Sequence, residues 1–215
     1  MTWHAPGDIP WEKVWESTAT RLDGHRVAGL QALLTEDVLR FAVVQELVEV
    51  GVAPKNIEAE WRRPMVPDAV DLVVLHPTRS AIEFKFPREP RETNAAWTQH
   101  LGEVIKDLYR LAHMPTDFAN RWCVQLLSNR MLRYLDGVSD RRGVRIGLRP
   151  GDVTILEPDL SLHLPPTAAK AIARWQNDGL WVRAQCRVVH DIGNELRLVA
   201  HTVEPASAGP GPSDP

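Results

Sequence analysis

The spacing of apolar residues alternates between helical and strand-like along the chain, and the order of these changes limits the folds it can adopt. Residues 35–50 have helical spacing, with Thr35 suited to the N-cap and Gly51 to the C-terminal stop. Three strands, a helix, a strand and a short helix follow; they cover 57–63, 71–75, 81–86, 94–113, 122–127 and 129–135. This order predicts an α/β fold in which helices flank a mixed central sheet.

The flanking segments predict an N-terminal helix and a C-terminal extension. Residues 10–22 open with a proline and continue at helical spacing, which indicates an amphipathic helix. After residue 143 we expect a strand, a helix and a β-hairpin, at 153–156, 167–175 and 181–203. The chain thus divides into an N-terminal helical segment, a core, a C-terminal α+β extension and a tail, at 1–34, 35–143, 144–204 and 205–215. The tail is rich in Pro, Gly, Ala and Ser, so we expect it to be disordered.

Composition excludes several classes of protein. The 25 basic and 28 acidic residues give a net charge of −3, which excludes histone-like binding of nucleic acid but leaves a local basic patch open. No apolar stretch approaches the roughly 20 residues of a membrane helix, and we expect neither a signal peptide nor a membrane partner. Two cysteines are too few for a disulfide framework, and we expect a cytoplasmic protein with reduced thiols. P-loop, dinucleotide-binding, nucleophile-elbow and zincin motifs are absent from the sequence.

Two acids and a lysine lie in strand segments that are otherwise apolar. Glu83 and Lys85 are two residues apart, so they project from the same face of one strand. If residues 76–80 form the connecting loop, Asp71 lies opposite Lys85 and its side chain joins that face. Charges on central strands are unfavourable unless they are paired or bind a metal, so these three residues are the candidates for a site.

This combination of residues has the chemistry of a metal-dependent hydrolase. Two carboxylates and a backbone carbonyl can hold Mg²⁺, a hard ion that takes oxygen ligands and keeps several waters. The metal lowers the pKa of a bound water and stabilises charge on a phosphoryl group. A neighbouring lysine can orient that water and neutralise the developing negative charge.

At these residues the sequence resembles the PD-(D/E)XK phosphodiesterase superfamily, which has the restriction-endonuclease-like fold. Pro67-Asp68 corresponds to the first half of the signature and Glu83-Phe84-Lys85 to the second half. The superfamily core, α-β-β-β-α-β, is the order read in the middle half of the chain. The resemblance implies a nuclease that depends on Mg²⁺ or Mn²⁺ and acts on DNA in preference to RNA. It also implies that the chain works as a homodimer or in a larger defence or repair complex.

The resemblance assigns roles to individual residues and leaves two acids open. Asp71 and Glu83 would bind the metal, and Lys85 would position the attacking water. Asp68 is the alternative first acid, because it follows a proline as the signature requires, whereas Asp71 opens the apolar strand and is favoured. A further acid in the first core helix corresponds to Glu36, with Glu46 as the alternative, although an acid in the first turn is also ordinary helix-dipole complementation. Polar candidates on the helix after the motif are Gln99, Lys106 and Asp107.

Residues 121–150 are locally basic. They contain seven arginines and two aspartates, a local charge of +5. In a chain of net −3, this segment indicates contact with nucleic-acid phosphates. The candidates are Arg130, Arg133, Arg141 and Arg142. The alternative is a solvated surface in a chain whose basic residues are mostly arginine.

Two further interpretations are open at this level. In one, the chain is a catalytically inactive member of the same fold that serves as a nucleic-acid-binding or assembly subunit, and its acids and lysine form a structural ion-pair cluster. In the other, the chain is an unrelated α/β domain with a coincidental motif. The arrangement of Asp71, Glu83 and Lys85 in space separates the second interpretation from the others.

Overall fold

The computed structural model of the chain describes residues 8–62, 69–87, 94–142, 144–175 and 179–209. The helices are α1 (Trp11–Val27), α2 (Glu36–Glu49), α3 (Asn94–Ala112), α4 (Asn129–Arg142) and α5 (Pro166–Ile172). The strands are β1 (Ile57–Arg62), β2 (Ala69–Val74), β3 (Ser80–Lys85), β4 (Asn120–Ser128), β5 (Val153–Leu156), β6 (Val182–Ile192) and β7 (Leu196–Val203). Short 3₁₀ helices are η1 (Gln31–Leu33), η2 (Pro54–Asn56) and η3 (Leu160–Leu162).

The strands form one mixed seven-stranded sheet in the order β1-β2-β3-β4-β7-β6-β5. The pair β3–β4 is parallel, and the other neighbouring pairs are antiparallel. A parallel pair needs a crossover connection, and α3 supplies it between β3 and β4. The expectation of an α/β fold with a mixed central sheet flanked by helices is confirmed.

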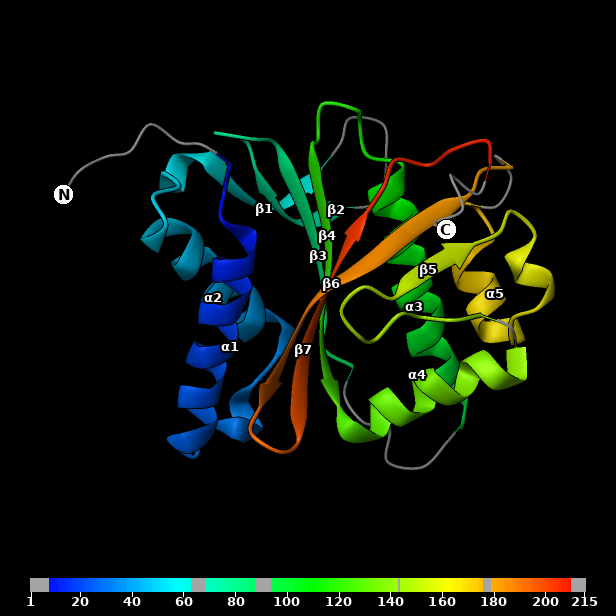
Figure 1. Cartoon of the computed structure of the whole chain (residues 1–215), viewed down its shortest axis with the longest axis horizontal. Helices are drawn as coiled ribbons and strands as arrows, with labels where there is room; N and C mark the ends of the chain where they lie inside the picture. The colour runs from blue at the N-terminus through cyan, green and yellow to red at the C-terminus, as the bar shows by residue number, and fades with distance from the viewer. Residues whose placement is uncertain (1–7, 63–68, 88–93, 143, 176–178, 210–215) are drawn as a thin grey trace.

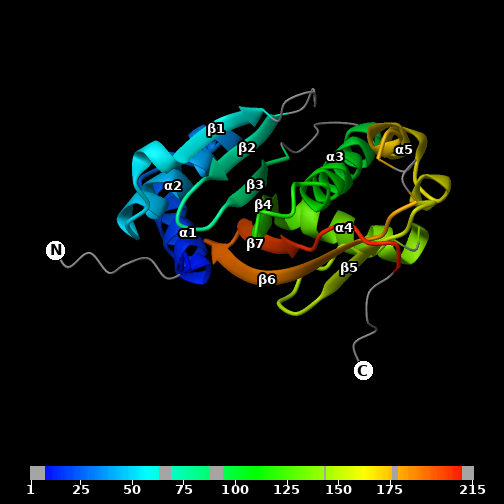
Figure 2. The same cartoon turned by 90° about the horizontal axis from the view of Figure 1, so that it is seen from above.

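Helices cover both faces of the sheet (Figure 1). α1 and α2 lie on one face, and α3, α4 and α5 lie on the other, as Figure 2 shows from above. Alternate residues of the strands pack into two separate hydrophobic cores, because successive side chains of a strand point to opposite faces. On β3, Ile82 and Phe84 pack in the core under α1 and α2, whereas Ala81 packs in the core under α3. Glu83 and Lys85 have the same parity as Ala81, so they are directed toward α3.

Helix ends follow local signals, with three differences in length. α5 ends at Ile172, before the expected residue 175. The Thr35 hydroxyl accepts a hydrogen bond from the Val38 N–H at 3.2 Å, so the expected N-cap of α2 is confirmed. α1 continues to Val27 and α4 to Arg142, beyond their expected ends at residues 22 and 135. The apolar pattern marks only the buried part of a helix, and a polar continuation carries no such mark.

The C-terminal segment extends the central sheet. β6 and β7 form the expected hairpin, and β7 pairs antiparallel with β4. Residues 205–209 were expected to be disordered, but the structure holds them by backbone hydrogen bonds: Ser207 pairs with Trp181, and the Ala206 N–H donates to the Ala112 carbonyl at 3.0 Å. The disorder prediction was based on side-chain composition, which does not register such backbone pairing. The rest of the expected tail lies outside the described residues.

Candidate functional site

The candidate site lies where β2 and β3 meet α3. Leu72 pairs with Ile82 in the register of β2 and β3, and by the same register Asp71 falls opposite Glu83. The prediction that Asp71 lies opposite Lys85 was therefore wrong by two residues. The loop covers residues 75–79, one position earlier than expected, because Leu75 leaves the strand. A shift of the strand register by an even number of residues leaves each side chain on its own face of the sheet. Asp71, Glu83 and Lys85 therefore remain on the same side.

Glu83 forms a buried ion pair with Arg110 of α3. Its side chain is 0% exposed, and its Oε1 accepts a hydrogen bond from Arg110 Nη1 at 2.7 Å. The same guanidinium nitrogen donates to the Ala69 carbonyl at 3.1 Å. Burial and the negative charges of Asp107 and Asp71 raise the pKa of Glu83 well above its ordinary value, against the effect of Arg110. Within the described residues, Glu83 Oε2 is buried and has no hydrogen-bond partner.

Lys85 forms a second ion pair with the same helix. Its Nζ lies 2.9 Å from Asp107 Oδ2 and donates to the Phe84 carbonyl at 3.0 Å. Burial acts to lower the pKa of Lys85, but the carboxylates of Asp107, Glu36 and Asp71 outweigh burial and raise it. Lys85 is therefore a permanent cation at neutral pH, suited to donating hydrogen bonds and neutralising charge, and unsuited to acting as a base.

Asp71 is the third residue of β2, two positions later in its strand than expected, and is held by the main chain and by an arginine. Its Oδ2 accepts a hydrogen bond from the Phe84 N–H at 2.7 Å, and its Oδ1 lies 3.9 Å from Arg40 Nη2. Arg40 on α2 also donates to Glu60 Oε1 at 2.7 Å. Glu60 has a φ of 51°, in the left-handed region that L-residues rarely adopt, and the register of β1 and β2 places it opposite Asp71. Strained backbone thus lies beside the candidate acid.

Glu36 joins the site from the other face of the sheet. Its Oε2 accepts a hydrogen bond from the Phe86 N–H at 3.3 Å, directly after β3. Burial raises the pKa of Glu36; Lys85 opposes this rise and Asp71 adds to it. The alternative acid, Glu46, lies elsewhere, because it pairs with Arg21 of α1 at 2.7 Å. The first turn of α2 therefore supplies the acid that lies near Lys85.

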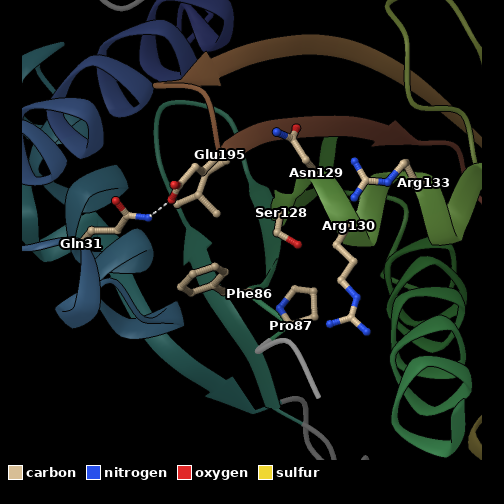
Figure 3. Close-up of a pocket in the computed structure, with 9 residues that line it drawn as sticks. Gln31, Phe86, Pro87, Ser128, Asn129, Arg130, Arg133 and Glu195 are labelled. Carbon is tan, nitrogen blue, oxygen red and sulfur yellow. Dashed lines mark hydrogen bonds between the residues drawn. The ribbon is translucent and has the colours of Figure 1, made fainter. Parts of the chain in front are cut away.

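The other candidates divide between those near the site and those away from it. Of the polar residues expected on α3, Asp107 is in the ion-pair cluster, Lys106 pairs with Glu103, and Gln99 is exposed. Asp68 lies outside the described residues, as do the side chains of Arg141 and Arg142 at the end of α4. Arg130 and Arg133 line a pocket with Phe86, shown in Figure 3.

Sequence reasoning missed Arg110, which the structure places at the centre of the site. A signal for it exists: Asp107 and Arg110 are three residues apart on a helix and interrupt its apolar face, next to Leu108 and Leu111. The closest contact between their side chains is 3.5 Å. Charged residues on a buried helix face need partners, and here the partners are the two charges of β3.

The acids fit a sparsely ligated Mg²⁺ or Mn²⁺ and do not fit a closed metal cage. Among the described residues, no group of three or more His, Cys, Asp or Glu side chains is arranged to hold a metal ion. Mg²⁺ commonly uses one or two carboxylates and keeps several waters. Asp71 and Glu83 supply that number, and the unpartnered Oε2 of Glu83 is a buried oxygen of the required kind.

Comparisons with protein-family models, with curated proteins and with solved structures found no match to this chain. Among the described residues, no helix has both the length and the apolar character needed to cross a membrane. The fold and the site together define an α/β protein with a mixed seven-stranded sheet and a buried ionic cluster between that sheet and one helix.

Proposed function

We propose that the chain is a divalent-metal-dependent phosphodiesterase with a restriction-endonuclease-like core, a nuclease for which DNA is the favoured substrate. The main support is the gathering of Asp71, Glu83, Lys85 and Glu36 around the end of β3. The order α2-β1-β2-β3-α3-β4, with a parallel β3–β4 pair, agrees with the core implied by the sequence resemblance. An unrelated domain with a coincidental motif gives no reason for these four side chains to converge.

Each residue has a role that follows from its surroundings. Asp71 and Glu83 would hold Mg²⁺ or Mn²⁺, which when bound supplies Lewis-acid stabilisation and an acidified water. Lys85, a permanent cation, neutralises the charge that develops on the phosphate and donates a hydrogen bond to the attacking oxygen. Glu36, whose pKa burial raises, is better suited to accepting a proton than an exposed glutamate.

A second candidate is a catalytically inactive member of the same fold that acts as a nucleic-acid-binding or assembly subunit. The ion pairs that α3 forms with Glu83 and Lys85 favour this second candidate. Arg110 already occupies Glu83 Oε1, and Asp107 already holds Lys85. In this alternative the charges stabilise the packing of α3 on the sheet, and neither carboxylate needs a metal.

A cleavage panel with a matched control separates the two candidates. Supercoiled DNA, linear DNA, single-stranded DNA and RNA are incubated with Mg²⁺ or Mn²⁺ and wild-type protein, Lys85→Ala or Lys106→Ala. Lys106 pairs with Glu103 outside the cluster, so its loss controls for the removal of a lysine. The nuclease proposal expects metal-dependent cutting that Lys85→Ala abolishes and Lys106→Ala retains. Absence of cutting, together with equal Mn²⁺ binding by wild type and Asp71→Asn in calorimetry, would favour the inactive subunit.

A further inference from the structure

A pocket of about 440 Å³ opens beside the candidate site, at the carboxyl ends of the parallel strands β3 and β4. Phe86 and Pro87 follow β3, and Ser128 ends β4 (Figure 3). In open α/β sheets, ligands bind in the crevice outside the carboxyl ends of the strands. The volume lies within the range of about 300 to 1,000 Å³ that small-molecule sites occupy.

The pocket has a cationic side and a polar side, separated by an apolar wall. Arg130 and Arg133 are three residues apart on α4 and line one side. Gln31 and Glu195 line the opposite side, joined by a hydrogen bond of 2.5 Å from Gln31 Nε2 to Glu195 Oε2 (Figure 3). Phe86 contributes an aromatic ring between them. A complementary ligand carries an anion at one end and a flat, apolar body with hydrogen-bond donors at the other.

The pocket is linked to the candidate catalytic residues through the backbone of Phe86. The Phe86 N–H donates to Glu36, and Lys85 immediately precedes Phe86. The pocket and the candidate site therefore meet at the end of β3, where Phe86 follows Lys85. Arginine recognises phosphate by paired hydrogen bonds, and aromatic rings stack on bases.

We propose that this pocket binds one unpaired nucleotide of the substrate strand, next to the bond that is cut; this inference rests on the proposed nuclease function. The phosphate of that nucleotide contacts Arg130 and Arg133, and its base lies against Phe86 and faces Gln31 and Glu195. A paired base cannot present its edge to the polar side while that edge is hydrogen-bonded to its partner. The preferred substrate is therefore single-stranded nucleic acid or a frayed duplex end.

The test measures binding without cleavage. A fluorescein-labelled single-stranded DNA 12-mer and its blunt-ended duplex are titrated in EDTA, with anisotropy as the readout. We expect tighter binding of the single strand by wild type, about tenfold weaker binding by Arg133→Ala and about fivefold weaker binding by Phe86→Leu. Arg149→Ala removes an exposed arginine of the same basic segment outside the pocket and should change affinity less than twofold.

Three results would overturn the pocket proposal. They are no single-strand binding by wild type, equal affinity of wild type and Arg133→Ala, and an equal loss in Arg133→Ala and Arg149→Ala. Failure of the pocket proposal and failure of the nuclease proposal can be told apart. If the protein neither cuts nor binds Mn²⁺ but binds single strands in a way that depends on Arg133, the pocket proposal is supported and the nuclease proposal is rejected. If the protein cuts with metal and Arg133→Ala binds as well as wild type, the nuclease proposal is supported and the pocket proposal is rejected.

Discussion

The guanidinium of Arg110 on α3 donates to the carboxylate of Glu83 on β3 at 2.7 Å, in a place where Glu83 has no solvent exposure. A buried charge that loses its partner is strongly destabilising, whereas replacing both partners by neutral groups is much less so. The pair therefore joins α3 to the sheet and at the same time occupies one oxygen of a proposed metal ligand. The stability of the fold and the chemistry of the site thus depend on the same contact.

We predict that Arg110→Met lowers the free energy of unfolding by about 3 to 5 kcal/mol, because it leaves the Glu83 carboxylate buried and unpaired. Adding Glu83→Gln to that variant removes the orphaned charge and should recover more than half of the loss. Urea denaturation of the wild type and of the single and double variants measures the effect. Equal stability of the single and double variants would show that the unpaired Glu83 charge does not cause the loss of stability.

A second prediction concerns Gly102, where α3 approaches α5. A Cβ at Gly102 would lie 2.7 Å from the Cα of Ala168, which is backbone and cannot move aside alone. We expect Gly102→Ala to destabilise the protein by about 1 to 3 kcal/mol despite the better helix propensity of alanine. Gly24 in α1 is the control, since nothing lies within 4 Å of its Cβ position. Gly24→Ala should stabilise by about 0.5 to 1 kcal/mol in the same thermal unfolding experiment.

A third prediction tests the strained backbone opposite Asp71. Glu60 has a φ of 51°, which glycine adopts readily and alanine does not. Both Glu60→Gly and Glu60→Ala lose the contact with Arg40, so their difference isolates the backbone. We expect the glycine variant to be more stable by about 1 kcal/mol. At the exposed neighbour Glu58 the order should reverse, and the same order at both positions in urea denaturation would contradict the assigned strain.

A fourth prediction concerns His201, a buried side chain on β7. Its Nε2 lies 2.5 Å from the Gly147 carbonyl oxygen and its Nδ1 lies 3.4 Å from Gln125 Nε2, contacts that a neutral ring with its proton on Nε2 makes. Burial lowers the pKa of His201 below its ordinary value of 6.5. In the unfolded chain the imidazole of His201 therefore takes up a proton near pH 6.5, whereas in the folded chain it stays neutral at that pH. The contribution of His201 to stability is complete above that pH and is lost as the pH falls.

Comparison of wild type with His201→Gln measures this linkage. Between pH 7.5 and 5.5 the wild type should lose stability more steeply, by at most about 1.4 kcal/mol per pH unit. The carboxylates of the ionic cluster titrate in both proteins, so their effect cancels in the difference. Parallel curves of unfolding free energy against pH for the two proteins would mean that folding does not lower the pKa of His201.

Much of the secondary structure was predictable because its signals are local. The Thr35 cap, the two-residue alternation that places Glu83 and Lys85 on one face, and the hairpin of β6 and β7 are each set within a few residues. The register of β2 and β3 was not predictable to the residue, because Leu75 is apolar yet leaves the strand. Strand register depends on core packing as well as on loop length.

The sequence by itself determined the order of elements, the face on which the candidate acids and lysine lie, and the presence of charges that need partners. Only the tertiary structure decided which residues pair with these charges. Arg110 and Asp107 meet Glu83 and Lys85 because α3 crosses from β3 to β4 over that face of the sheet. Periodicity is a property of a few neighbouring residues, whereas an ion pair between elements depends on how a helix and a sheet pack, and no local signal specifies that.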